Sequence, residues 1–132
     1  MKYTISAAKD GDYILIVVQE VINRQIGIKV IQDSHALGDQ LGIDKFLMDL
    51  TDAVNEDSTI DQYAFAHTDI PRTDGLNYFA KVAVLVDPAD HSHDFIETVL
   101  RNAGFNVLLF HDRKEAMTFL NLKANKQQQQ TD

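Results

Sequence analysis

The last third of the chain alternates between continuous apolar runs and stripes of apolar residues at helical spacing. Residues 82–86 are all apolar, which is typical of a strand covered on both faces in a parallel sheet. Pro88 ends this run, because proline has no amide hydrogen for a strand ladder. A helical stripe follows, with Asp90 or Ser92 as the expected N-cap and Gly104 as the C-terminal stop. Its members are Phe95, Ile96, Val99, Leu100 and Ala103.

A second strand and a second helix complete this segment. Residues 105–110 form another β-type run, and Asp112 with Glu115 resembles the capping box of a last helix. Two strands joined by one helix of this length should lie parallel, with a right-handed crossover. The segment therefore predicts a βαβ unit followed by a helix.

Residues 22–42 fit two patterns. Ile26, Ile28 and Val30 alternate as in a strand, whereas Ile26, Val30, Leu37 and Leu41 recur at helical spacing. The helical period persists for longer, so we predict a helix over residues 23–41, although its many β-branched residues weaken the helical propensity. Gly42 is expected to end it.

The remaining apolar runs predict three strands and one helix. Residues 3–7 and 13–18 should form a hairpin, and residues 45–51 a further strand. A helix over residues 59–69 should be stopped by Pro71, because the residue before a proline avoids the α conformation.

Together these elements predict an α/β fold in the order ββαβαβαβα, with a mixed, mostly parallel five-stranded sheet and four helices. We expect a single domain over residues 1–122 and a disordered polar tail over residues 123–132. The 45% apolar content suits a soluble globule. The sequence has no cysteine, no signal-like N-terminus and no apolar run near the roughly 20 residues that span a bilayer, so we expect a cytoplasmic protein without an integral membrane segment.

The net charge of −8 comes from the centre of the chain. Eleven acidic and three basic residues lie between Asp44 and Asp94, so this segment alone carries a charge of −8. A surface of that sign repels phosphate backbones and anionic lipid, so nucleic-acid binding and direct adsorption to a membrane are both disfavoured.

Four stretches resemble the STAS-like bacterial proteins. They are residues 45–51 (KFLMDLT), 63–69 (YAFAHTD), 90–99 (DHSHDFIETV) and 110–120 (FHDRKEAMTFL). That family is similar to sporulation anti-sigma-factor antagonists and is grouped with the SEC14-like (CRAL-TRIO) lipid-carrier fold. The resemblance implies a non-enzymatic signalling module that contacts a protein partner and forms a homodimer. Its alternative is a carrier or sensor of a small apolar ligand, and an enzyme comes third.

Ser58 is the one residue that the resemblance carries over as a possible phosphoacceptor. The antagonists place a serine at the start of the helix that follows the third strand of the sheet, in a motif like Asp-Ser-Ser-Gly-Leu. The corresponding stretch here, after the strand at residues 45–51, reads Asp57-Ser58-Thr59-Ile60. The second serine and the glycine are missing. Because Asp61 follows three residues after Ser58, we expect Ser58 to act first as an N-cap.

An acidic rim is expected where two parallel strands end, because ligands of open α/β sheets bind at that edge. Four acids plus a helix dipole could hold a cation or a positively charged partner group there. The predicted rim comprises Asp49, Asp52, Asp87, Asp90, His91, Tyr63 and His67. His91 and His93 are also conceivable as a metal pair, but no third ligand is fixed by spacing, so we predict no metal site and expect His91–His93 to form an exposed helical turn.

Aromatic residues flank the loop that contains Pro71, namely Tyr63, Phe65, Tyr78 and Phe79. Apolar residues at helical spacing usually face inward, so we expect ordinary core. The alternative is that this helix and loop swing to uncover an apolar cleft for a lipid or a partner helix. No nucleophile–base pair, phosphate-binding glycine loop or pair of catalytic carboxylates can be assigned, so we expect neither catalysis nor a cofactor.

Overall fold

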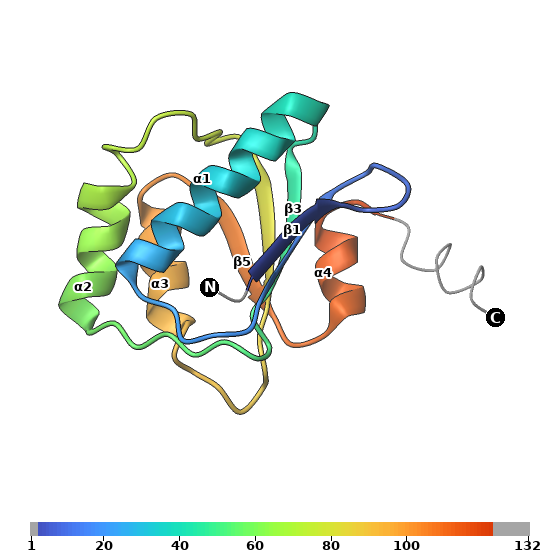
Figure 1. Ribbon diagram of the computed structural model, residues 1–132. Coiled ribbons are helices and arrows are strands. Elements are labelled where there is room, and N and C mark those ends of the chain that lie inside the picture. Colours follow the sequence, from blue (N-terminus) through green and yellow to red (C-terminus); the bar gives the residue numbers. More distant parts are fainter. Residues whose placement is uncertain (1–2, 123–132) are drawn as a thin grey trace.

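The computed structural model describes residues 3–122, whose five strands form one mixed sheet (Figure 1). The strands lie in chain order across the sheet, and only the first pair is antiparallel. They are β1 (Tyr3–Ala7), β2 (Ile14–Val18), β3 (Lys45–Asp49), β4 (Lys81–Leu85) and β5 (Asn106–Phe110). The predicted mixed, mostly parallel sheet is therefore confirmed.

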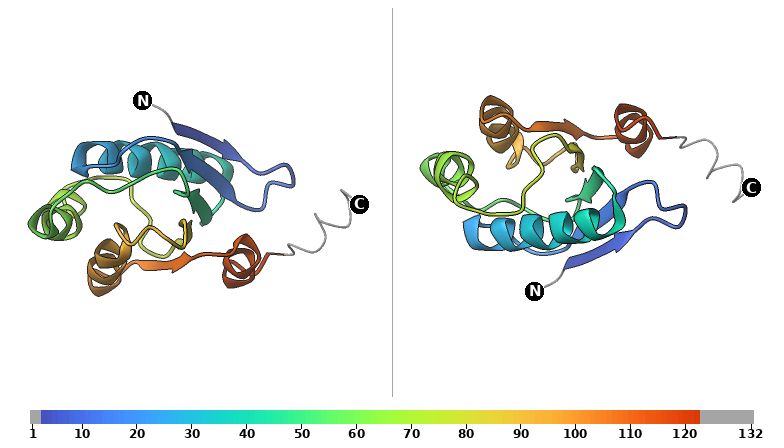
Figure 2. Two further views of the ribbon diagram at one scale, coloured as in Figure 1. Left: turned by 90° about the horizontal axis from the view of Figure 1, so that it is seen from below. Right: turned by 90° about the horizontal axis from the view of Figure 1, so that it is seen from above.

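The helices cover the two faces of the sheet unequally. They are α1 (Arg24–Leu41), α2 (Thr59–Ala64) with its π-helical continuation η1 (Phe65–Asp69), α3 (Asp94–Asn102) and α4 (Arg113–Phe119). Right-handed crossovers between parallel strands that follow one another in order place the connecting helices on the same face. Accordingly α1, α2 and α3 lie on one side, and α4 lies on the other (Figure 2).

Alternating side chains of each strand divide the core into two layers. Ile14, Ile16 and Phe46 face the side of α1 and α3, whereas Leu47 and Ala83 face α4. All five are almost completely buried, so both faces of the central strands are covered. This double burial explains why these strands read as continuous apolar runs.

The ambiguous segment is a helix, as its longer periodicity predicts. Asn23 is its N-cap and accepts a hydrogen bond from the amide of Ile26, while Gly42 ends it with φ of 70°. Val30 and Ser34 form its buried stripe. Tertiary burial of this stripe therefore compensates for the modest propensity of the β-branched residues.

The predicted cap of α4 is confirmed, the predicted caps of α3 are not, and the predicted tail is not tested. Asp112 caps α4 as predicted, through a bond from the amide of Lys114. The predicted N-caps of α3 are wrong: the N-cap is His93, without a side-chain bond, while Asp90 instead accepts the amide of Ser92 in the preceding turn. The predicted disordered tail, residues 123–132, lies outside the described residues.

Side chains of α3 protect the outer edge of β5. The carboxylate Oε2 of Glu97 accepts the amide of Leu109 at 2.6 Å, and Nη1 of Arg101 donates to the carbonyl of Val107 at 3.0 Å. These backbone groups point away from β4, so α3 satisfies groups that an exposed edge would leave unpaired. β1 forms the opposite edge of the sheet.

Candidate ligand cavity

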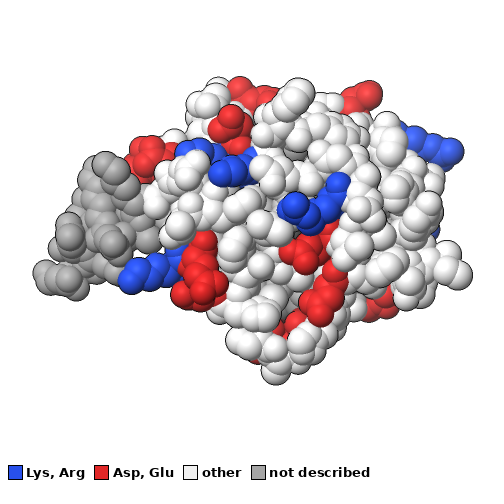
Figure 3. All heavy atoms as spheres, turned by 180° about the vertical axis from the view of Figure 1, so that it is seen from behind, with Lys and Arg blue, Asp and Glu red and all other residues white. Residues whose placement is uncertain are grey.

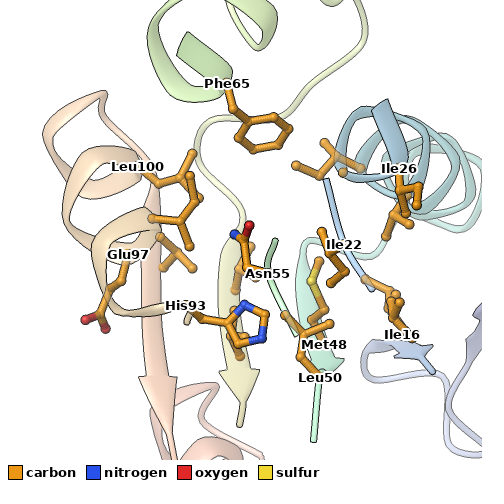
Figure 4. Close-up of a pocket in the computed structure, with 18 of the residues that line it drawn as sticks. Ile16, Ile22, Ile26, Met48, Leu50, Asn55, Phe65, His93, Glu97 and Leu100 are labelled. Carbon is orange, nitrogen blue, oxygen red and sulfur yellow. The ribbon is translucent and has the colours of Figure 1, made fainter. Parts of the chain in front are cut away.

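An apolar cavity lies between the sheet and the helices on its α1 side. It measures about 130 Å³. Figure 4 shows side chains converging on it from the strands, from α1 and from α3. A cavity of about 150 Å³ with apolar walls can stay dry and bind a molecule as large as benzene. Its walls include Ile16, Ile26, Met48, Phe65, Val84 and Leu100.

The cavity exists because α2 and η1 stand away from the sheet. α2 packs mainly against α3, η1 packs against α1 and α3, and both make few contacts with the strands. The two views of Figure 2 show α2 at one end of the molecule, between α1 and α3. Together α2 and η1 connect α3 with α1 and leave space above the strands. We call this segment, residues 59–69, the roof.

Phe65 is the buried aromatic side chain of this roof. Its ring extends from η1 toward the space between α1 and α3 (Figure 4), and only 7% of the residue is exposed. Gly27 of α1 permits this position, because a Cβ there would lie 2.9 Å from Cε1 of Phe65. The glycine thus lets the ring lie directly against the backbone of α1.

An ion pair joins the roof to α1. Arg24 donates through Nε and Nη2 to the two carboxylate oxygens of Asp69, at 2.7 and 2.8 Å, and through Nη1 to Asp61 at 3.4 Å. The hydrogen bonds from Arg24 lower the pKa of Asp69, and the same bonds raise the pKa of Arg24. This bidentate contact fixes the spacing of α1 and η1 beside the cavity.

Two histidines line the cavity and are held by backbone groups. Nδ1 of His35 accepts the amide of Asn77 at 2.9 Å, and the ring stacks on Phe46 at 4.9 Å. Burial lowers the pKa of His35. His93 is 1% exposed, and its Nε2 donates to the carbonyl of Ala53 at 2.8 Å. The expectation of an exposed turn at His93 is therefore wrong.

Gln62 is the buried polar side chain of α2, and its amide oxygen Oε1 lacks a hydrogen-bond partner among the described residues. Nε2 donates to the carbonyl of Asp57 at 3.0 Å, whereas the buried Oε1 accepts no hydrogen bond. Burial raises the pKa of Asp57, the neighbouring acid that also lines the cavity. Gln62 is not among the site residues that the sequence predicts, although a glutamine four residues before Ala66 in a helix with apolar positions is a detectable signal.

Ser58 is the N-cap of α2, as predicted. Its Oγ accepts the amide of Asp61 at 3.2 Å and donates to the carboxylate Oδ2 of Asp61 at 3.1 Å. The serine is exposed at the start of the helix that roofs the cavity. Phosphorylation of this hydroxyl stays a prediction.

The acids of the predicted rim act locally as turn formers. Asp49, Asp87 and Asp90 each accept a hydrogen bond from the backbone amide two residues further along. The bond from the amide of Ser92 lowers the pKa of Asp90. Asp52 is exposed in the loop after β3. Since β3 and β4 are adjacent and parallel, these loops do share one edge of the sheet.

The strand order decides whether a binding crevice forms at the edge of the sheet that carries the loops after β3 and β4. A crevice forms at the end of an open α/β sheet where the strand order reverses, so that neighbouring loops diverge to opposite faces. Here the order runs from β1 to β5 without reversal. The rim therefore lies at no such reversal of strand order, and partner binding by these acids stays a prediction.

The other predicted rim residues lie elsewhere or pair locally. His91 contacts Asp94 at 3.1 Å, within the turn before α3. The rings of Tyr63 and His67 contact each other, with centroids 4.3 Å apart and planes tilted by 34°, on the exposed side of α2 and η1 and not in the loops after β3 and β4. Over residues 3–122 we find no group of three His, Asp or Glu side chains arranged to hold a metal ion.

The expectation of ordinary core for the four aromatic residues holds only for Phe65. Tyr63, Tyr78 and Phe79 are 55%, 39% and 93% exposed. Tyr78 stacks on Phe105 at 4.3 Å. The outer side of the roof therefore carries apolar groups in water, and the inner side carries the cavity.

Charge does not gather on the face opposite to that of Figure 1. There, Lys and Arg side chains lie interspersed among Asp and Glu (Figure 3). In the described part of the chain, none of the helices has the length and apolar character that crossing a lipid bilayer demands.

No protein-family model matches this chain, and no curated protein is significantly similar to it in sequence. The resemblance to STAS-like proteins therefore stays a prediction, and the fold and the cavity carry the functional argument.

Proposed function

We propose that this protein is a non-enzymatic binding module that encloses a small apolar ligand under the α2–η1 roof. The observation that supports this most is the cavity of about 130 Å³ between the strands, α1, α3 and η1. Protein interiors are normally packed without voids of this size, because each lost contact costs dispersion energy. A ligand that fills the space recovers those contacts.

Support also comes from the chemistry of the walls. Ile16, Met48, Val84 and Leu100 offer no reactive group. The lining histidines are engaged by backbone groups, as His35 and its contact with Asn77 illustrate. Binding without transformation is therefore the function that these side chains favour.

A test uses benzene and the thermal unfolding of the full chain. Benzene at about 100 times its dissociation constant should stabilise the native state by about 2.7 kcal/mol, seen as a rise in Tm. Val84→Phe should abolish this rise, because Val84 lines the cavity and a larger ring would occupy it. Val54→Phe is the matched control, since Val54 is 51% exposed and does not line the cavity. An unchanged Tm in the wild type, or an equal rise in both variants, would refute the proposal.

A second candidate is a protein-interaction module, acting as a homodimer or with another partner. Its support is the outer side of the roof, where Ile60 and Tyr63 are 80% and 55% exposed. Exposed apolar side chains that lie together can mark an interaction surface. Because the same short helix covers the cavity, a ligand that moves Phe65 would also move Ile60, and the two candidates combine into a ligand sensor.

Sedimentation velocity separates the second candidate from the first. A homodimer through the roof predicts a concentration-dependent shift from monomer to dimer, and Ile60→Asn should abolish it. Ligand-dependent dissociation would support the sensor. A monomer at all concentrations, with and without benzene, would refute the homodimer.

A further inference from the structure

Gln62 adds a buried polar side chain to the apolar wall of the cavity. Only 7% of Gln62 is exposed, and the residue belongs to the cavity lining. Its Oε1 is fully buried and accepts no hydrogen bond from residues 3–122. Buried acceptors in native proteins are nearly always paired, so an unpaired one calls for a partner that the chain does not supply.

The orientation of the amide follows from its neighbour. Nε2 lies 3.0 Å from the carbonyl oxygen of Asp57, which can only accept. Exchanging the two ends of the amide would place two acceptors together, so the oxygen must be the free end. The cavity therefore offers an acceptor at this point and needs a donor.

The surrounding charges exclude an anionic head group. Asp57 lines the cavity beside Gln62, and no Lys or Arg belongs to the described lining. Asp61 precedes Gln62 in the same helix turn. Arg24 offsets the charge of Asp61, but this arginine is already engaged by Asp61 and Asp69. A carboxylate or phosphate brought to Gln62 would therefore meet an acceptor and the carboxylate of Asp57, with no cation among the described lining residues.

We propose that the ligand is a compact apolar molecule with a neutral hydrogen-bond donor, an alcohol or a primary amide, which donates to Oε1 of Gln62. This inference rests on the proposed function, because it assigns the polar contact of the ligand in the same cavity. The apolar walls supply most of the affinity, and Gln62 sets the preference among ligands of equal size.

Four probes of similar size test the assignment by isothermal titration calorimetry on the full chain. Hexanol donates a hydrogen bond, methyl pentyl ether only accepts, heptane does neither, and hexanoate is anionic. We expect hexanol to bind about tenfold more tightly than methyl pentyl ether, because only hexanol pairs with the buried oxygen. Hexanoate should bind more weakly than hexanol.

Gln62→Met provides the matched variant, since methionine has a similar length and no amide oxygen. In this variant hexanol and the ether should bind with about equal dissociation constants, because the acceptor is gone. Heptane should bind as in the wild type. If the variant does not fold, the ranking of the four probes on the wild type still decides the matter.

Three outcomes overturn the inference. Equal binding of hexanol, ether and heptane to the wild type would mean that Oε1 selects nothing, as when a water molecule satisfies it. Retention of the hexanol preference in Gln62→Met would place the contact elsewhere, and tighter binding of hexanoate would contradict the charge argument. Failure of all probes to bind would instead overturn the proposed function as well, so the two failures are distinguishable.

Discussion

Gly27 and Gly38 of α1 allow a matched test of how the packing responds to one added methyl group. A Cβ at Gly27 would lie 2.9 Å from Cε1 of Phe65. A Cβ at Gly38 would lie 2.7 Å from the carbonyl oxygen of Ile43 and 2.9 Å from Cζ of Phe46. Both added methyl groups would lie closer than 3.0 Å to another atom, but the obstacles differ: at Gly27 it is a side chain beside a cavity, and at Gly38 it includes backbone.

The expected free energies follow from two opposing effects. Replacing glycine by alanine within a helix favours folding by roughly 0.5–1 kcal/mol. Overpacking a region that cannot yield costs about 1–3 kcal/mol. Gly38→Ala should therefore destabilise the protein by roughly 1–2 kcal/mol, because the carbonyl of Ile43 belongs to the backbone that follows α1. In Gly27→Ala the ring of Phe65 can move into the cavity, so stability should stay equal or rise by up to about 1 kcal/mol.

Urea unfolding of both variants measures the difference, provided that the m-value stays constant. We expect Gly27→Ala to exceed Gly38→Ala in unfolding free energy by about 2 kcal/mol. Gly27→Ala should also weaken benzene binding, because the displaced ring takes up cavity volume. A loss of stability in Gly27→Ala as large as that in Gly38→Ala would refute the reasoning, since it would show that Phe65 has no space into which to move.

Three further predictions concern the cap, the buried histidine and the ion pair. Ser58→Ala should lower the unfolding free energy by about 1 kcal/mol in chemical denaturation, whereas Ser58→Asp should not, because aspartate also caps helices. The lowered pKa of His35 means that its stabilising contribution is complete above about pH 6.5 and is lost as the pH falls through the folded-state value. Wild type should therefore lose more stability than His35→Gln between about pH 7 and pH 5, and parallel pH profiles would contradict this. Arg24→Met should speed amide hydrogen exchange in η1 while lowering global stability by only about 0.5–1 kcal/mol, and Lys29→Met, at an exposed position of the same helix, should do neither.

Most of the fold could be predicted because its signals are local. The helix at residues 24–41 follows from apolar spacing that persists over five turns, together with an asparagine and a glycine at its ends. The strands follow from short apolar runs bounded by turn residues. Capping residues and apolar period agree in these segments, and such agreement makes a sequence interpretable.

The roof could not be predicted, because its geometry depends on tertiary packing. A regular α-helix over residues 59–69 places Ile60, Tyr63 and His67 on one face, and the rule that apolar residues at helical spacing face inward would bury Tyr63. In the structure the helix widens into a π-helix at Phe65, and Gln62 and Phe65 face inward instead. Both sides of the helix carry apolar residues, so periodicity alone does not decide which side meets the core.

The buried histidine shows the same limit at a single residue. His93 lies beside His91 in a polar stretch, which is typical of a solvated turn. Its burial depends on the carbonyl of Ala53, a partner 40 residues away in the sequence. Contacts across such separations leave no periodic trace, so neither His93 nor the cavity it lines could be recognised in advance.

The side chains of Glu97 and Arg101 that close the edge of β5 leave the two ends of the sheet unequal. A sheet that is open at both ends can recruit copies without limit and grow into a fibre. Over residues 3–122, β1 forms the other edge of the sheet, and two copies joined there edge to edge would bury both of these edges at once. Growth by strand addition would thus stop at a pair, and the largest assembly reachable by that route is fixed by two side chains on α3.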